Sequence, residues 1–147
     1  TSPSGLVTMQ LPFHVSCRRS HPALFELSDG RFQKVEAGEL APWCSGRGYL
    51  LVELALADFL RSMQTDRLQF EPAIVFDPRT GQEDRSLVRI RIGQYFAVDQ
   101  IRDLALDGDR LLALEDTYVF ASPGLKRALV DAGFSYLRFS EGLSEFA

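Results

Sequence analysis

The sequence contains little histidine, cysteine or lysine. Two of its 147 residues are histidine and two are cysteine, which leaves few side chains for a metal centre or a nucleophile paired with a base. Two cysteines in a chain of this length do not make a disulfide framework, so we expect reduced thiols, as in the cytoplasm. Fourteen of the sixteen basic residues are arginine. Arginine favours fixed, bidentate contacts, although biased codon usage explains the preference equally well.

Long hydrophobic runs are also missing. The longest candidate, residues 49–60, carries Glu53 and Asp58 and falls well short of the roughly 20 apolar residues that cross a bilayer. The first residues show no basic stretch followed by an apolar one, which a secretory signal would need. We therefore expect a cytoplasmic protein with no membrane partner, in which residues 1–8 are a flexible tail or an addition to the natural chain.

The composition is that of one soluble globular domain spanning residues 1–147. Hydrophobic residues make up 46% and charged residues 24% of the chain, which excludes intrinsic disorder. A net charge of −4 argues against a nucleic-acid partner, since such proteins carry a basic patch or stripe. The acidity is concentrated in residues 94–147, which hold nine acidic and five basic side chains.

Local patterns predict an α+β fold with a largely antiparallel sheet and two or three helices. Residues 52–63 have helical spacing, with apolar side chains at Val52, Leu56, Phe59, Leu60 and Met63; residues 49–51 are a strand in the alternative interpretation. We expect further strands at residues 11–15, 23–27, 31–35, 73–76, 87–92, 111–114 and 118–120. Residues 36–48 are predicted to be a loop around Trp43, and residues 98–106 a short helix or turn.

Two supersecondary units follow from turn chemistry. The segment Asp77–Gly81 is a turn signal, and it predicts a hairpin of strands 73–76 and 87–92 with a polar tip at residues 78–86. Near the C-terminus, Ser122 is a suitable N-cap with Pro123 at the first helical position. Gly133 ends that helix, and residues 134–139 form a closing strand.

Two kinds of site are conceivable from the few histidines and cysteines: a zinc site and a Cys/His catalytic pair. His14, Cys17, His21 and Cys44 could bind zinc, but their spacing matches no known finger pattern. A small enzyme that uses Cys17 with His14 or His21 is the alternative. Ordinary packing or surface placement explains these residues better. We find no Gly-rich phosphate loop and no Gly-x-Ser-x-Gly motif, so no catalytic residue, metal or cofactor is predicted.

Binding of another protein is the function that the remaining features favour. Most of an acidic segment forms the candidate contact face, namely Asp103, Asp107, Asp109, Glu115 and Asp116. Such a face would attract a basic partner, although a solvated helix and turn is the simpler explanation. Trp43 is a candidate exposed anchor, unless it plugs its own core. A row of arginines (Arg79, Arg85, Arg89 and Arg91) could bind an anion, or could simply be a solvated strand face.

The run DLALDGDRLLALEDTYVFASPGLKRALVDAGFSYLRF, within residues 99–139, resembles immunity proteins that bacteria use against polymorphic or contact-delivered toxins. The similarity lies in the strand ending at Ser122, the helix around residues 125–129, the stop at residues 132–134 and the last strand. The resemblance implies a cytoplasmic protein that binds a cognate toxin domain one to one and neutralises it. An adaptor or accessory domain of a secretion system would be a binder of the same kind with a different partner.

Overall fold

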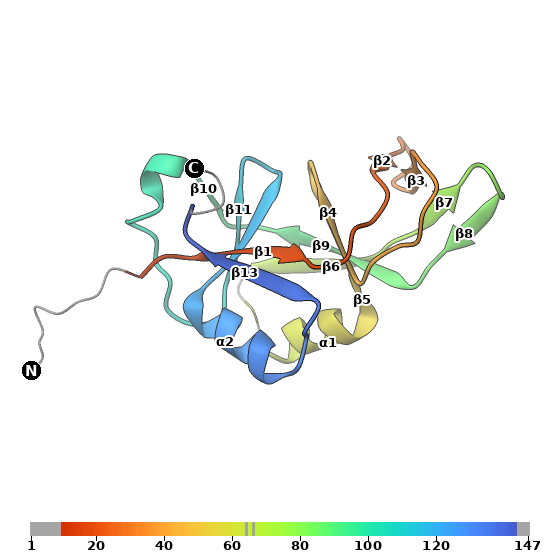
Figure 1. The fold of residues 1–147 in the computed structure, drawn as a ribbon. Helices are drawn as coiled ribbons and strands as arrows, with labels where there is room; N and C mark the ends of the chain where they lie inside the picture. The colour runs from red at the N-terminus through yellow and green to blue at the C-terminus, as the bar shows by residue number, and fades with distance from the viewer. Residues whose placement is uncertain (1–9, 64, 66, 144–147) are drawn as a thin grey trace, which may run out of the picture.

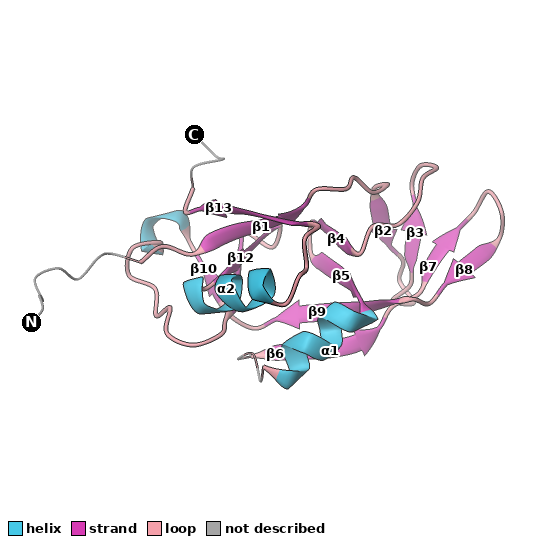
Figure 2. Cartoon of the chain, turned by 60° about the horizontal axis from the view of Figure 1, so that its bottom comes forward, coloured by secondary structure: helices cyan, strands magenta, loops and turns pink. Residues whose placement is uncertain are grey.

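The described part of the chain forms three small β-sheets, with two helices on one side of them (Figures 1 and 2). The computed structural model describes residues 10–63, 65 and 67–143. Within these residues the helices are α1 (Leu54–Ser62) and α2 (Pro123–Asp131). The strands are β1 (Phe13–Cys17), β2 (Leu24–Glu26), β3 (Phe32–Lys34), β4 (Trp43–Gly46), β5 (Tyr49–Glu53), β6 (Leu68–Pro72), β7 (Val75–Asp77), β8 (Gln82–Asp84), β9 (Leu87–Ile92), β10 (Tyr95–Phe96), β11 (Leu111–Leu114), β12 (Tyr118–Ala121) and β13 (Leu137–Glu141).

The sheet orders show an α+β architecture that is mostly antiparallel. Sheet A runs β10-β11-β12-β1-β13, sheet B runs β2-β3-β7-β8, and sheet C runs β4-β5-β9-β6. Two pairs are parallel, β3 with β7 and β10 with β11. The strand β1 lies between β12 and β13 and is antiparallel to both, so the C-terminal strand–helix–strand unit is completed by a strand from the other end of the chain.

Three apolar clusters hold the sheets together. The largest is shared by sheets A and C and both helices, and it includes Trp43, Leu56, Leu60, Leu125 and Leu129. A second cluster joins sheets B and C, and a third fills the outer side of sheet A beneath residues 98–106. Sheet C therefore packs on both of its faces, which explains why β9 has four consecutive buried residues, Leu87–Ile90.

The C-terminal unit has the predicted order of elements, although its closing strand, β13, begins at Leu137 rather than at residue 134. The Ser122 side chain accepts a hydrogen bond from the Leu125 amide at the start of α2, and Pro123 occupies the first turn. Gly133 follows the helix with a φ of +90°, the left-handed conformation that glycine adopts most easily. The strands predicted at residues 23–27 and 31–35 are also present, as β2 and β3, and they pair antiparallel as a hairpin.

The structure corrects two predictions about the middle of the chain. The hairpin of residues 73–76 with 87–92 does not form, because the Asp77–Gly81 turn reverses the chain at once and β7 pairs with β8. Strand β9 instead pairs with β5 and β6, in another sheet. Of the two interpretations of residues 49–63, the one with a strand before the helix is confirmed, but β5 continues through Glu53 and the helix therefore begins at Leu54 rather than at residue 52.

No described helix has the length and apolar character needed to cross a membrane.

Candidate partner-binding surface

Strands β5 and β9 separate at one end of sheet C and form a fork. Their antiparallel pairing extends from Glu53↔Leu87 to Leu51↔Arg89 and stops there. Beyond that point β5 continues beside β4 as far as Gly46↔Tyr49, while β9 continues beside β6 as far as Leu68↔Ile92. The β4–β5 hairpin thus leaves β9 and leans toward sheet A.

The tip of the β11–β12 hairpin closes the open side of the fork. The Gly48 amide donates a hydrogen bond of 2.6 Å to the Asp116 carbonyl oxygen, so the tips of the two hairpins are joined through their backbones. Between them lies a cavity of about 90 Å³. This volume is far below the several hundred cubic ångströms of a pocket for a drug-sized ligand, and it suits a single side chain.

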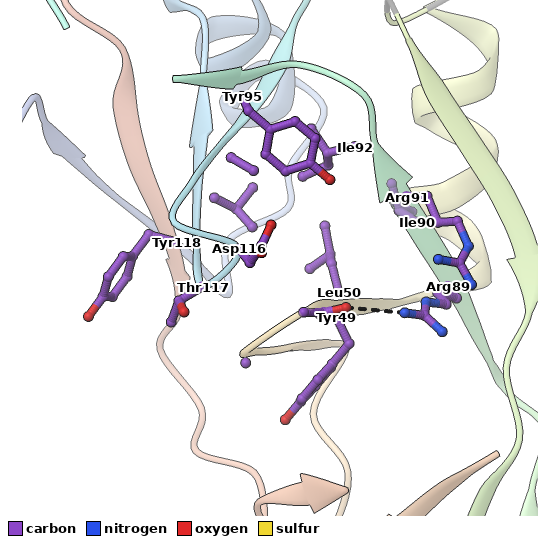
Figure 3. Close-up of a pocket in the computed structure, with 14 residues that line it drawn as sticks. Tyr49, Leu50, Arg89, Ile90, Arg91, Ile92, Tyr95, Asp116, Thr117 and Tyr118 are labelled. Carbon is purple, nitrogen blue, oxygen red and sulfur yellow. Dashed lines mark hydrogen bonds between the residues drawn. The ribbon is translucent and has the colours of Figure 1, made fainter. Parts of the chain in front are cut away.

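The cavity is lined by residues from sheets A and C (Figure 3). Its apolar floor is formed by Leu50, Ile90 and Val119, which belong to the largest core cluster. Tyr95, which is 62% exposed, extends over it from β10. Tyr118, which is 37% exposed, points away from it in Figure 3 and packs edge-on against the His14 ring at 6.0 Å between ring centroids.

The turn that carries Glu115 and Asp116 has an unfavourable backbone. The Thr117 amide donates to the Leu114 carbonyl oxygen at 3.2 Å, and the two residues between them have φ values of +56° and +58°. This is a type I′ turn, in which both central residues are left-handed and Asn-Gly or Asp-Gly is strongly preferred. A left-handed conformation costs an ordinary residue about 1–2 kcal/mol. The cost falls mainly on Glu115, because aspartate adopts this conformation more readily than most residues other than glycine. The turn nevertheless holds two exposed carboxylates at this tip.

The structure divides the predicted acidic face into two groups. Glu115 and Asp116 lie at one end of β11, whereas Asp103, Asp107 and Asp109 lie in the segment before its other end. Four strand residues separate the groups by about 13 Å or more. The Asp107 carboxylate lies 3.9 Å from the Arg110 guanidinium, and its carbonyl oxygen accepts from Arg110 Nε at 2.7 Å. Only Glu115 and Asp116 adjoin the fork.

Trp43 is not an exposed anchor. It begins strand β4, its side chain is 1% exposed, and it packs in the largest core cluster. The Gly/Pro-rich composition of residues 36–48 suggested a loop, but residues 43–46 pair with β5 across their whole length. The tryptophan fills the core next to this edge strand, so it is removed from the candidate contact residues.

The four arginines do not form one strand face: only Arg89 and Arg91 lie on β9, while Arg79 and Arg85 are exposed beside Asp77 and Glu83. Arg89 is 6% exposed, and its guanidinium donates to both Glu26 carboxylate oxygens, at 2.7 and 3.3 Å, and to the Gly48 carbonyl oxygen at 3.1 Å. The bonds from Arg89 to the Glu26 carboxylate lower the pKa of Glu26. The bond to the carbonyl oxygen holds Gly48 at the fork. Arg91, which is more exposed, donates from Nε to Glu71 at 2.9 Å.

The structure does not place the Cys17 and His14 side chains together. His14 and Cys17 are three residues apart on β1, so their side chains leave opposite faces of the sheet. Cys44 is buried, donates to the Ala41 carbonyl oxygen, and has its pKa raised to about 11 by burial. Over residues 10–63, 65 and 67–143, no three His, Cys, Asp or Glu side chains cluster closely enough to hold a metal ion.

Two residues of this surface, Tyr95 and Tyr118, were not identified from the sequence. Tyr118 comes two residues after the acidic turn, as the first residue of β12. Its place at the tip could therefore have been inferred. Nothing local indicates that Tyr95 lies over the same tip, because β10 joins β11 as a parallel neighbour.

Comparisons with protein-family models, with curated proteins and with solved structures find no match for this chain.

Proposed function

We propose that the protein is an immunity protein, which binds a cognate bacterial toxin domain in the cytoplasm and neutralises it by occupying its surface rather than by catalysis. Its contact surface is the fork together with the residues and cavity that adjoin it, namely Tyr95, Tyr118, Glu115, Asp116 and the cavity beside them. One observation carries the proposal: the type I′ turn holds two carboxylates in left-handed backbone, where Asn-Gly would be more stable. Strained residues of this kind concentrate where binding requires them.

The composition of the surface supports an interface with a protein. Tyrosine is enriched among the residues that contribute most to binding, and Tyr95 and Tyr118 are among the large hydrophobic side chains that remain exposed. The two carboxylates at the tip would meet a basic face of the toxin and speed the encounter. The small cavity would receive one side chain of the toxin.

Co-expression tests the proposal directly. The toxin candidate is the C-terminal domain encoded by the neighbouring gene, placed under an inducible promoter with and without this protein. We expect growth to be restored only when this protein is present, and the two chains to purify together as a one-to-one complex. Toxicity without rescue, or no complex, would contradict the function itself.

The turn provides a variant that separates binding from folding. The double substitution Glu115→Asn with Asp116→Gly removes both carboxylates and introduces the residues that the turn prefers. We expect the double variant to be more stable, by about 1 kcal/mol or more, yet to bind the toxin at least tenfold more weakly in calorimetry. Asp107→Asn with Asp109→Asn, at the other end of β11, is the matched control and should bind normally. Equal binding by both double variants would exclude the fork as the contact surface.

A further inference from the structure

The charges around the cavity at the fork do not cancel. Its charged lining residues are Arg89, Arg91 and Asp116. Each arginine already has a glutamate partner outside the lining, because Arg89 donates to Glu26 and Arg91 donates to Glu71. Within the part of the chain that the structure describes, no hydrogen bond or ion pair engages the Asp116 carboxylate. The uncompensated charge that this lining carries is therefore negative.

The backbone of the turn holds Asp116 against the cavity. Its φ is +58°, and its carbonyl oxygen accepts the hydrogen bond from the Gly48 amide, so the turn is tied to the opposite hairpin. Figure 3 shows the Asp116 carboxylate on the side of the cavity that Tyr95 extends over, and directed toward that ring. Glu115, the other central residue of the turn, does not line the cavity. The turn thus places one of its two carboxylates at the cavity and the other outside it.

The remaining walls suit the hydrocarbon part of a long side chain. The floor of Leu50, Ile90 and Val119 is apolar, and lysine and arginine bury their stems on surfaces of this kind while their charged ends stay at the rim. The ring of Tyr95 above the floor can attract a cation through its face. A volume of about 90 Å³ leaves room for one such side chain and for no larger ligand.

We propose that this cavity binds one cationic side chain of the toxin, an arginine or a lysine, whose charged group pairs with Asp116 beneath Tyr95. The inference rests on the proposed function and names the class of residue that the fork recognises. An apolar side chain would remove water from the Asp116 carboxylate without giving it a partner, which is unfavourable. An acidic side chain would be repelled by it. Asp116 therefore determines which toxin residue the cavity accepts.

Double-mutant cycles on the complex of the full chain with the toxin candidate of the co-expression test measure this pairing. Each arginine and lysine of the toxin domain is changed in turn to methionine, which keeps an apolar stem and removes the charge. Dissociation constants are then measured by calorimetry with the wild type and with Asp116→Asn. Asparagine tolerates the left-handed backbone of the turn, so this variant keeps the fold. We expect one basic residue of the toxin to show a coupling with Asp116 of at least about tenfold in affinity.

Two controls separate this pairing from general attraction by the tip. Glu115→Gln changes the same charge in the same turn but outside the cavity lining, and its coupling with that toxin residue should stay below about threefold. Tyr95→Phe keeps the aromatic ring and should bind as the wild type does. Tyr95→Leu removes the ring at an exposed position and should weaken binding by about threefold or more.

The possible failures of this inference and of the proposed function are distinct. A complex that forms and rescues growth, but in which no basic residue couples to Asp116, would overturn the inference and leave the function standing. Equal coupling of Asp116 and Glu115 would overturn it as well. Weaker binding by Tyr95→Leu without any loss in Asp116→Asn would show that the cavity takes an apolar side chain, and would also contradict it. The absence of any complex would contradict the function, and the inference with it.

Discussion

The Tyr136 hydroxyl donates a hydrogen bond to a Glu53 carboxylate oxygen across 83 residues of sequence. Glu53 is the N-cap residue of α1 but makes no side-chain hydrogen bond to that helix, because its carboxylate faces Tyr136 just before β13. Burial, together with this carboxylate, raises the pKa of Tyr136 far above its usual value. The pair connects sheet C to the C-terminal strand of sheet A.

Removing this hydroxyl should destabilise the protein. Tyr136→Phe leaves the part-buried Glu53 carboxylate without its donor, which should lower the free energy of unfolding by about 1–3 kcal/mol. Urea titration followed by the fluorescence of Trp43, the single and buried tryptophan, measures the change. Tyr95→Phe, at an exposed tyrosine, is the control and should shift the value by less than about 0.5 kcal/mol. Equal losses in both variants would contradict a specific role for the pair.

The same tyrosine predicts a loss of stability in alkali. Above pH 10, the ordinary tyrosine value, Tyr136 loses its proton in the unfolded chain but keeps it in the folded one. Stability is therefore complete below that pH and falls as the pH rises further. Unfolding measured between pH 8 and 11 should show a smaller decline for Tyr136→Phe than for the wild type. Parallel pH profiles would show that this pair does not contribute.

Cys44 should be unreactive while the protein is folded. Its thiol is buried and its pKa is raised to about 11, so almost no thiolate exists at neutral pH to attack a reagent. In Cys17→Ser, which leaves Cys44 as the single thiol, we expect iodoacetamide to label the folded protein far more slowly than the same protein in urea. Labelling at the rate of a free cysteine would show that the β4 region opens readily.

The Arg89–Glu26 ion pair should contribute more to stability than the exposed Arg91–Glu71 ion pair, whose arginine lies on the same strand, β9. Glu26→Gln removes the charge that faces a nearly buried guanidinium and should cost about 1–3 kcal/mol. Glu71→Gln, in a pair about half exposed on both sides, should cost less than about 1 kcal/mol. Because Arg89 lowers the pKa of Glu26 below 4.5, its contribution is present above pH 4.5 and is lost as the pH falls through the lowered value. Urea titrations at pH 7 and pH 3 measure both effects, and equal losses for the two variants at pH 7 would contradict the ranking.

Ser122 should be sensitive to the loss of a single oxygen atom. Its buried hydroxyl accepts from the amides of Leu125 and Arg110 and donates to the Gly108 carbonyl oxygen at 2.8 Å. Ser122→Ala should lower the free energy of unfolding by about 1–3 kcal/mol, at the upper end for a lost N-cap. Ser62→Ala, at an exposed hydroxyl in the last turn of α1, is the control. If both variants lose the same stability in urea titration, the hydrogen-bond network at Ser122 has no special role.

The parts of the fold that could be predicted from the sequence are those set by neighbouring residues. The Ser122-Pro123 start and Gly133 end of α2 depend on backbone groups within a few positions, and the Asp77–Gly81 turn does so as well. Pairing between distant segments carries no comparable signal. Nothing near residues 87–92 indicates that they are buried on both faces, so their alternating apolar and basic pattern suggested a half-exposed strand.

The candidate site likewise contains residues that local sequence predicts and a geometry that depends on distant segments. Glu115 and Asp116 could be identified because they are charges between two apolar strands, and such positions project from a hairpin tip. The fork could not be predicted, since it arises where β5 loses its pairing with β9 while it stays paired with β4 and meets a second sheet. Trp43 was wrongly predicted to be an exposed anchor, because the Gly and Pro residues around it suggested a loop. Local composition does not show that its strand, β4, packs in a core shared by two sheets and two helices.

The position of β1 between β12 and β13 has a consequence for the order of folding. Residues 13–17 take both of their hydrogen-bonded neighbours from residues 119–141, so sheet A is completed only after the two ends of the chain have met. Closing so large a loop loses entropy before any pairing compensates for it, and folds dominated by such distant contacts form in milliseconds to seconds. Until then β12 presents an unpaired edge beside α2. During that interval the exposed edge of β12 could pair with another chain, so the arrival of β1 also protects sheet A against aggregation.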